Sequence, residues 1–292
     1  MKECDLELEL PYDFEREQRY ALLVSDNVYG KDDPRALPTL QRVALWYEEA
    51  GWYLSARNLY IRAVEIVRRS AGDTDLRMVE PLRGIARTRR LAYAHGLEPT
   101  DIEVNAGSSR ISDLQWRRSV RVLDRLGEES LKRAIKILRM QSDAERAELV
   151  DTLLDLGDWY QVSETWRNAL GLYKEALTES SASDSVTPLF NEPVPVIYRM
   201  EDVGIKLRHP LPHPERYNLY WVKFDFTVRH DGRIANLKVI ESDAPDTYRS
   251  SITESFQRTV YRPRFTQGEP VKTEHVRFQQ GLYVKKESRS PS

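Results

Sequence analysis

The chain has 292 residues, of which 40% are hydrophobic and 31% charged, the composition of a folded globular protein and not of a disordered one. The net charge of −2 is uneven: residues 181–292 hold 17 Lys/Arg against 14 Asp/Glu, a net of +3, and the preceding residues hold 27 against 32, a net of −5. Neither part has the strongly basic balance of a nucleic-acid-binding domain. No apolar run approaches the ~20 residues that a membrane span needs, so we expect no transmembrane segment.

The length favours about two domains. The single cysteine, Cys4, excludes an intrachain disulfide and a cysteine-rich metal site. The first residues, MKECDLELEL, begin with acidic side chains and lack an apolar core, so they do not have the pattern of a secretory signal peptide. Such sparse use of cysteine is compatible with a periplasmic and with a cytoplasmic location.

A sequence pattern recurs within the first 180 residues, at an offset of 42 positions. Each copy begins with a glycine, has an aspartate three residues later and then carries apolar residues at helical spacing. The matched pairs are Gly30/Gly72, Asp33/Asp75, Leu37/Val79, Leu40/Leu82, Val43/Ile85 and Ala44/Ala86. So many matches at one offset indicate a repeated structural unit.

The order of small and large residues within a unit resembles the tetratricopeptide repeat, in the longer form seen in kinesin light chains. In such repeats small residues let two antiparallel helices approach closely, and large residues fill the space between neighbouring hairpins. The family positions are matched by Leu40, Val43, Ala44, Tyr47, Ala56, Tyr60 and Ala63, and again by Leu153, Leu156, Gly157, Tyr160, Ala169, Tyr173 and Ala176. We therefore predict that residues 1–180 form an all-α solenoid of about three to four helical hairpins.

The middle of the predicted solenoid departs from the repeat pattern. Arg89 stands where the first unit has Tyr47, and residues 97–110 are rich in Gly, Ser and Asn, which predicts a loop. A helix is expected to restart after Ser112, whose side chain suits an N-cap. Residues 14–29 are expected to form the second helix of a half repeat or a cap.

The repeat register predicts a protein-binding groove, because the first helix of each hairpin lines the concave side of such a solenoid. The predicted groove residues are Gln41, Leu45, Glu48, Arg83, Arg87, Arg90, Leu154, Asp158 and Gln161. The three arginines follow one helical stripe and suit an acidic peptide or a C-terminal carboxylate. The alternative is a solvated arginine face whose charges pair with Glu80 and neighbouring acids.

The C-terminal third has the alternating pattern of a β-sheet. Along residues 219–228, LYWVKFDFTV, apolar and aromatic side chains occupy every second position. The dipeptide Asp231-Gly232 predicts a type I′ hairpin turn into a second strand. An amphipathic helix that ends at Pro263 is expected next, followed by a last strand. The residues that this helix is expected to bury are Ile252, Phe256 and Val260.

This part of the chain resembles the C-terminal domain of TonB, the periplasmic energy-transducer family of Gram-negative bacteria. The family's landmark positions are occupied in order by Gly232, Pro263, Phe265, Gly268, Pro270 and Val271. The resemblance implies a small α+β domain over residues 197–285, an antiparallel three-stranded sheet with one helix. A Ser/Pro-rich linker or arm at 181–196 is expected before it and a disordered tail at 286–292 after it.

The resemblance also implies an exposed sheet edge, because members of that family offer an edge to an extended strand of their partner. The predicted edge residues are Val271, Thr273, His275 and Arg277. The alternative is that the arm at 186–198 or the repeat domain covers this edge.

The sequence has no arrangement of residues typical of catalysis, so we do not expect an enzyme. His209 and His213 have the spacing of metal ligands on a helix, but the prolines around them forbid a helix, so neither metal nor cofactor is expected. We expect a periplasmic adaptor of the Gram-negative cell envelope, with one protein partner in the groove and another at the sheet edge. The alternatives are a scaffold in which the sheet domain packs on the solenoid, an energy transducer trimmed of its anchor, and a cytoplasmic location.

Overall fold

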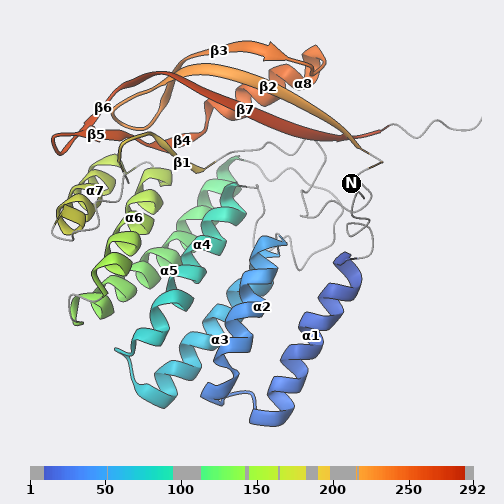
Figure 1. Cartoon of the computed structure of the whole chain (residues 1–292), viewed down its shortest axis with the longest axis vertical. Helices are drawn as coiled ribbons and strands as arrows, with labels where there is room; N and C mark the ends of the chain where they lie inside the picture. The colour runs from blue at the N-terminus through green and yellow to red at the C-terminus, as the bar shows by residue number, and fades with distance from the viewer. Residues whose placement is uncertain are drawn as a thin grey trace, which may run out of the picture. The chain divides into compact units, whose positions relative to one another are not determined.

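The computed structural model describes residues 10–50, 52–94, 113–141, 145–163, 165–181, 190–197, 215 and 217–286 (Figure 1). Within these ranges the chain is helical up to residue 181 and then forms antiparallel strands and one further helix. This arrangement agrees with the predicted helical domain followed by a sheet domain, while membership of the two families stays a prediction. The features expected at Cys4, 97–110, Ser112, His209 and His213 lie outside the described residues.

The described part of the chain divides into two compact units. The first contains α1 (Leu10–Tyr29), α2 (Leu37–Glu49), α3 (Tyr53–Ala71), α4 (Val79–Ala94) and α5 (Asp113–Arg139), with 3-10 turns η2 (Pro34–Ala36) and η3 (Leu76–Met78). The second contains α6 (Arg146–Val162), α7 (Trp166–Ser181), α8 (Asp246–Gln257) and all the strands. The boundary expected from the sequence lay at residue 180, whereas the contacts group α6 and α7 with the strands.

The two turns between the repeated units of the first compact unit have the same structure. Gly30 and Gly72 have φ angles of 96° and 92°, a left-handed conformation that favours glycine. Asp33 and Asp75 each accept a hydrogen bond from the backbone N–H two residues later, at 2.8 and 2.9 Å, and so cap η2 and η3. Hydrogen bonds from Arg35 lower the pKa of Asp33 to about 2. The offset read from the sequence therefore marks equivalent turns.

The core of the first unit is formed by residues that define the repeat pattern. Leu40, Val43, Ala44, Ala56, Tyr60 and Ala63 are each at most 1% exposed. The Tyr60 ring lies against Gly84 of α4, where an added Cβ would come within 2.6 Å of the ring. Glycine at this position therefore allows α4 to approach α3 closely.

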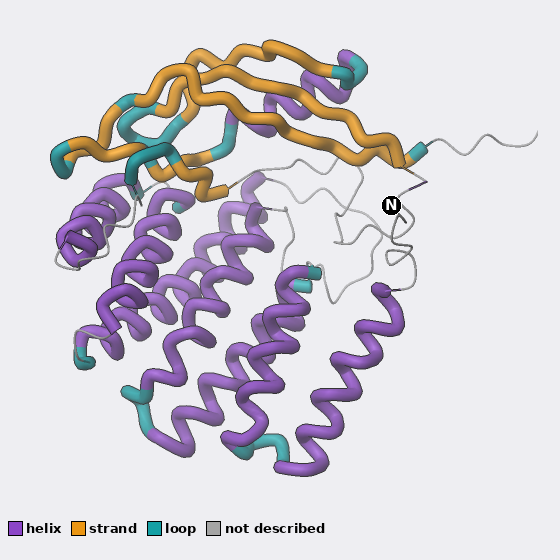
Figure 2. The backbone as a smooth tube through the Cα atoms, viewed as in Figure 1, coloured by secondary structure: helices purple, strands orange, loops and turns teal. Residues whose placement is uncertain are grey.

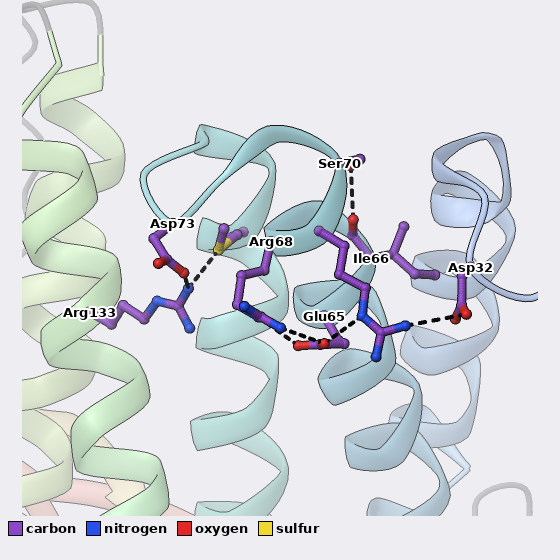
Figure 3. Close-up of polar contacts among 9 residues, drawn as sticks. Asp32, Glu65, Ile66, Arg68, Ser70, Asp73 and Arg133 are labelled. Atoms are coloured by element: carbon purple, nitrogen blue, oxygen red, sulfur yellow. Dashed lines mark hydrogen bonds and ion pairs between the residues drawn. The ribbon is translucent and has the colours of Figure 1, made fainter.

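Exposed ion pairs join the ends of neighbouring elements in the first unit (Figure 3). Glu65 of α3 accepts hydrogen bonds from two arginines on its own helix, and one of these also reaches the turn before η2. The pairs are Arg68–Glu65, Arg69–Glu65, Arg69–Asp32 and Arg133–Asp73. Because the pairs are exposed, each stabilises the fold only slightly.

The strands of the second unit, orange in Figure 2, form a central three-stranded antiparallel sheet and two short two-stranded ones. Their order is β3-β2-β7 in the central sheet, β1-β4 in the second and β5-β6 in the third. The strands are β1 (Val194–Ile197), β2 (Tyr217–Val228), β3 (Ile234–Ser242), β4 (Val260–Arg262), β5 (Arg264–Thr266), β6 (Glu269–Val271) and β7 (Thr273–Lys285).

The alternation along β2 places one face of the central sheet against α8. The inward residues Val222, Phe224, Phe226 and Val228 are each at most 1% exposed. Phe256 of α8 stacks on Phe224, with ring centroids 4.4 Å apart, and on Phe278 of β7 at 5.4 Å. Burial of these aromatic rings supplies the core of the sheet domain.

The turn after β2 differs from the expected type I′ turn. It has a three-residue loop, 230–232, in which Gly232 alone has a positive φ, 78°. The backbone N–H of Arg229 donates to the carbonyl of Arg233 at 2.9 Å. This is the geometry of a type I turn followed by a left-handed residue. An added Cβ on Gly232 would lie 2.0 Å from the carbonyl oxygen of Tyr261, so the turn has no room for a larger residue.

The segment after α8 also differs from the prediction. The helix ends at Gln257 and not at Pro263, and Val260, expected in the helix, begins β4. Strand β4 pairs with β1, so residues 194–196, expected in the linker, belong to a strand that ends at Ile197. The β-branched Val260 favours a strand, and its pairing partner, Ile197, lies too far away in the sequence for a local helical pattern to reveal it.

Candidate protein-binding surfaces

Strand β7 is one edge of the central sheet. It pairs with β2 on one side, and on its other side no strand among the described residues pairs with it. Strand β1, part of the arm that was expected as an alternative cover for this edge, pairs with β4 instead. An unpaired edge offers a row of backbone N–H and C=O groups to an added strand.

The first part of β7 is poorly suited to strand addition. Between Phe226 and Val228 of β2 the pairing register shifts, and His275 takes a positive φ of 55°, so β7 has a bulge there. The side chains of His275 and Arg277 are 83% and 77% exposed and both approach Asp225, at 3.3 and 3.8 Å. A bulge and charged side chains are features that protect an edge from pairing.

The second part of β7, residues 278–284, has neither a bulge nor a charged side chain. The register is regular from the pair Phe226↔Val276 to the pair Tyr217↔Lys285, without a shift. Residues 278–284 contain no charged side chain. The other edge of the sheet, β3, is interrupted by two register shifts, so β7 offers the longer regular edge.

Of the predicted edge residues, Thr273, His275 and Arg277 lie on β7, as expected. The assignment of Val271 to this edge was wrong, because it belongs to β6 and pairs with Arg264 of β5. The prediction missed the regular part of the strand around Gln279. A left-handed histidine has no sequence signal comparable to that of glycine, so the bulge could not be read beforehand.

The predicted arginine stripe on α4 is partly engaged within the first unit. Arg87 Nε donates to Glu48 Oε1 at 2.5 Å, and its Nη2 donates to Glu80 at 3.0 Å. The Tyr60 hydroxyl donates to Glu48 Oε2 at 3.1 Å. Burial lowers the pKa of Arg87, but the hydrogen bond and charge of Glu48 outweigh it and leave that pKa above its ordinary value.

The remaining predicted groove residues of this unit differ in exposure. Leu45 is 46% exposed, while Gln41, Arg83 and Arg90 are half-buried. Glu48 is 8% exposed, so it is a structural partner of Arg87 and not an open contact for a ligand. These positions favour the alternative in which the arginines pair with neighbouring acids, since Glu80 is one of the partners of Arg87.

In the second unit the predicted groove residues Leu154, Asp158 and Gln161 are buried, at 4, 5 and 5% exposure. Asp158 accepts hydrogen bonds from Arg262 of β4, at 3.0 and 2.8 Å. The side-chain amide of Gln161 donates to the carbonyl of Asp231 at 2.6 Å. The expectation that these residues contact a separate partner was therefore wrong, because the chain's own strands occupy this face of α6.

The same set of chemical groups occurs in both units. In the first unit Tyr60, Glu48 and Arg87 contact one another, and in the second Tyr173 donates to Asp158 Oδ1 at 2.9 Å while Arg262 lies over the Tyr173 ring at 5.6 Å. Burial, followed by the charge of Asp158, raises the pKa of Tyr173 well above its ordinary value. Arg87 comes from the following repeated unit, whereas Arg262 comes from a strand. Strand β4 thus supplies to α6 and α7 the arginine that a following helix supplies to α2 and α3.

Aromatic side chains complete the packing of α7 against the strands. The Tyr173 ring contacts Phe190 and Phe265 edge-on, with centroids 6.2 Å apart in each case, and the rings of Phe190 and Phe265 are 4.7 Å apart. All three side chains are at most 8% exposed. The α6–α7 hairpin and the short sheets therefore share one core.

In the part of the chain that the structure describes, no group of three or more His, Cys, Asp or Glu side chains has the geometry to hold a metal ion. No described helix combines the length and the apolar character needed to cross a bilayer.

Comparisons with known proteins give little further guidance. Neither a protein-family model nor a curated protein matches the chain significantly. Among solved structures the chain is similar to BtubC (BKLC) from P. vanneervenii, with a TM-score of 0.44 and 16% identity over 59% of this chain and 57% of that one. The match thus spans less than two thirds of BtubC, and so distant a likeness assigns no family.

Proposed function

We propose that the protein is a non-enzymatic adaptor that binds an extended segment of a protein partner along β7. The observation that carries this proposal is the regular edge of β7 over residues 278–284, which has no charged side chain and pairs with no described strand other than β2, beside a second edge that is broken by two register shifts. An added strand forms main-chain hydrogen bonds with such an edge, which supply affinity, while neighbouring side chains supply specificity. The resemblance to the TonB C-terminal domain supports the same mode of binding.

Proline substitutions at two adjacent positions test the proposal. In a regular antiparallel edge strand, only one of two neighbouring residues points its N–H toward β2, so Gln279→Pro and Gln280→Pro remove different bonds. We expect the variant that loses the outward N–H to keep its thermal stability and to lose partners captured from an envelope extract. The other variant should lose stability.

The matched control is Ile240→Pro on the interrupted edge strand β3, where the side chain is 52% exposed. We expect this variant to keep every partner that the unchanged chain captures. Retention of all partners by both β7 variants would exclude strand addition at this edge.

A second candidate function is a structural scaffold, in which the strands stabilise the helices and do not bind a partner. The shared core of α6, α7 and the short sheets favours it, through the buried Asp158–Arg262 pair and the aromatic cluster around Tyr173. In that case capture depends on helical residues such as Leu45, the most exposed of the predicted groove positions. Loss of partners on Leu45→Asp, with no loss in either β7 variant, would favour the scaffold.

We propose the periplasm of a Gram-negative bacterium as the compartment, on the strength of the TonB resemblance. A periplasmic adaptor meets extended segments of envelope proteins, which suits strand addition. Fractionation of cells that express the natural gene tests this part of the proposal: recovery in the cytoplasmic fraction alone would refute it and leave the binding mode to be judged separately.

A further inference from the structure

The hydrogen bonds of β2 show which backbone groups of β7 face the free edge. The backbone N–H of Trp221 donates to Asp243 Oδ1 at 2.6 Å, and its carbonyl accepts from the Asp243 N–H at 3.3 Å, so both groups face the β3 side. Opposed residues in a regular antiparallel pair direct their backbone groups either toward each other or away from each other. Gly281, opposite Trp221, therefore directs its N–H and C=O to the free edge, and so does Gln279.

The order of residue types along the regular part of β7 is nearly symmetric about Gln280. Residues 276–284 read VRFQQGLYV, with a valine at each end and with Phe278 and Leu282 two positions from the centre. These four apolar side chains pack in or against the core beneath the sheet. The bulge at His275 ends just before this stretch, and the pairing is regular to Lys285, so the regular stretch has nearly the same centre.

We infer that β7 pairs antiparallel with β7 of a second copy, about a two-fold axis that passes through Gln280 perpendicular to the sheet. Gln279 of one copy and Gly281 of the other then lie opposite each other and exchange both main-chain hydrogen bonds. The inference rests on the proposed function, because both require a β7 edge that accepts an added strand. It adds a regulation of that edge: a second copy covers the edge and must leave before a partner segment binds.

The apolar pattern selects this register over its neighbours. Paired residues share a face of the sheet, so a two-fold axis of this kind passes through a residue. At Gln280 the axis places valine opposite valine and Phe278 opposite Leu282, and apolar cross-strand pairs stabilise a sheet. An axis one residue away on either side places Gln280 opposite Phe278 or Leu282, and one of these two registers also places Arg277 opposite Lys285. An axis two residues away places Gln280 opposite a valine.

The same symmetry favours a second copy over an unrelated segment as the occupant. A strand that pairs with itself needs matching residue types at equal distances from the axis, whereas an unrelated segment places no such demand on β7. Helix α8 packs mainly against β3, at the opposite edge of the sheet, so the helices of two copies joined at β7 lie apart. The charged residues before Arg277 lie outside the paired stretch.

Disulfide trapping tests the position of the axis. In a Cys4→Ser background, Gln280→Cys places two thiols on the axis with Cα atoms about 4.5 Å apart, within the range of a disulfide. We expect mild oxidation to convert this full-length chain to a covalent dimer.

The matched control is Gln279→Cys, whose copies lie about 7–8 Å apart across the axis and should not crosslink with each other. Gln279→Cys should crosslink only when it is mixed with Gly281→Cys, the position opposite it. No covalent dimer from Gln280→Cys, or equal crosslinking of Gln279→Cys alone, overturns the inference.

Sedimentation across a concentration series measures self-association without a thiol. We expect the unchanged chain to dimerise, and we expect Gln279→Pro to weaken the dimer at least about tenfold, because proline removes an N–H that faces the second copy. Thermal denaturation verifies that the variant is folded, since this N–H does not bond to β2. A dimer that is unchanged in a folded Gln279→Pro variant overturns the inference.

A synthetic peptide of residues 276–284 separates failure of the dimer from failure of strand addition. We expect the peptide to bind the edge and convert the dimer to monomers, and a peptide of the same composition in scrambled order to have no effect. A chain that is monomeric at every concentration but binds the peptide overturns the inference and leaves the proposed binding mode standing. A monomeric chain that does not bind the peptide overturns the inference and contradicts strand addition at β7 as well.

Discussion

At the scale of single residues, Arg262 joins strand β4 to helix α6 in the second unit through a buried ion pair. Its guanidinium bonds to Asp158, and the two side chains are 10% and 7% exposed. We expect Arg262→Ala to lower the free energy of unfolding by about 3–5 kcal/mol, because removal of one partner leaves a buried charge uncompensated. Urea denaturation measures the change. Lys174→Ala removes an exposed pair with Glu269 and should cost less than about 1 kcal/mol. Equal losses in the two variants would contradict the structural role of the buried pair.

Two helical glycines of the second unit, Gly157 and Gly171, are expected to change the stability in opposite directions when each is replaced by alanine. An added Cβ on Gly157 would lie 2.4 Å from the Tyr173 ring, whereas at Gly171 nothing lies within 4 Å. We expect Gly157→Ala to destabilise the protein by about 1–3 kcal/mol through overpacking. Gly171→Ala should stabilise it by about 0.5–1 kcal/mol, because alanine loses less backbone entropy in a helix. Thermal denaturation distinguishes the two, and a stabilising Gly157→Ala would show that α6 and α7 are not packed this closely.

At the scale of elements, the ion pairs around Glu65 link α3 to the turn before η2 (Figure 3). Hydrogen bonds from Arg68 and Arg69 lower the pKa of Glu65 from 4.5 to about 2. A carboxyl with a depressed folded-state pKa stabilises the fold above its unfolded pKa and loses this effect as pH falls through the folded value. The native chain should therefore be slightly more stable than Glu65→Gln at pH 6, by an amount that shrinks between pH 4.5 and about 2.

Urea denaturation of both proteins at several pH values measures this difference. Because the carboxyl is exposed, added salt should reduce the difference at pH 6 as well. If the difference in the free energy of unfolding persists unchanged at the lowest pH, Glu65 acts through packing and not through charge.

Elements set by local periodicity could be predicted, and those set by distant partners could not. The burial of Tyr60 follows from a helical pattern of apolar residues and that of Phe224 from a strand pattern, and each pattern spans only a few neighbouring residues. The pairing of β1 with β4 and the bond from Arg262 to Asp158 join residues far apart in the chain, so no local pattern shows them. Asp158 accordingly reads as a groove residue in the repeat register, although its partner is a strand of the same chain.

At the scale of the whole molecule, the end of the helical pattern at residue 181 is not the end of a compact unit. Helices α6 and α7 belong with the strands, which supply Phe265 to the buried Tyr173 ring and Arg262 to Asp158. A chain cut after residue 181 therefore exposes apolar surface and leaves a carboxylate without its arginine. Partners lost on such a cut would not identify the strands as the binding site, since the helices lose their own support.

Hydrogen exchange measured by mass spectrometry tests whether helices α6 and α7 depend on the strands for their stability. In the intact chain we expect peptides from 146–181 to be strongly protected, because their core is shared with Phe190 and Phe265. In a chain that ends at residue 181 the same peptides should exchange at least about tenfold faster, since opening of the hairpin then costs less free energy. Peptides from α2 and α3, which belong to the other compact unit and have their own core, serve as the internal reference. Unchanged protection of 146–181 in the shortened chain would mean that the hairpin is stable alone and that the strands are a separate module.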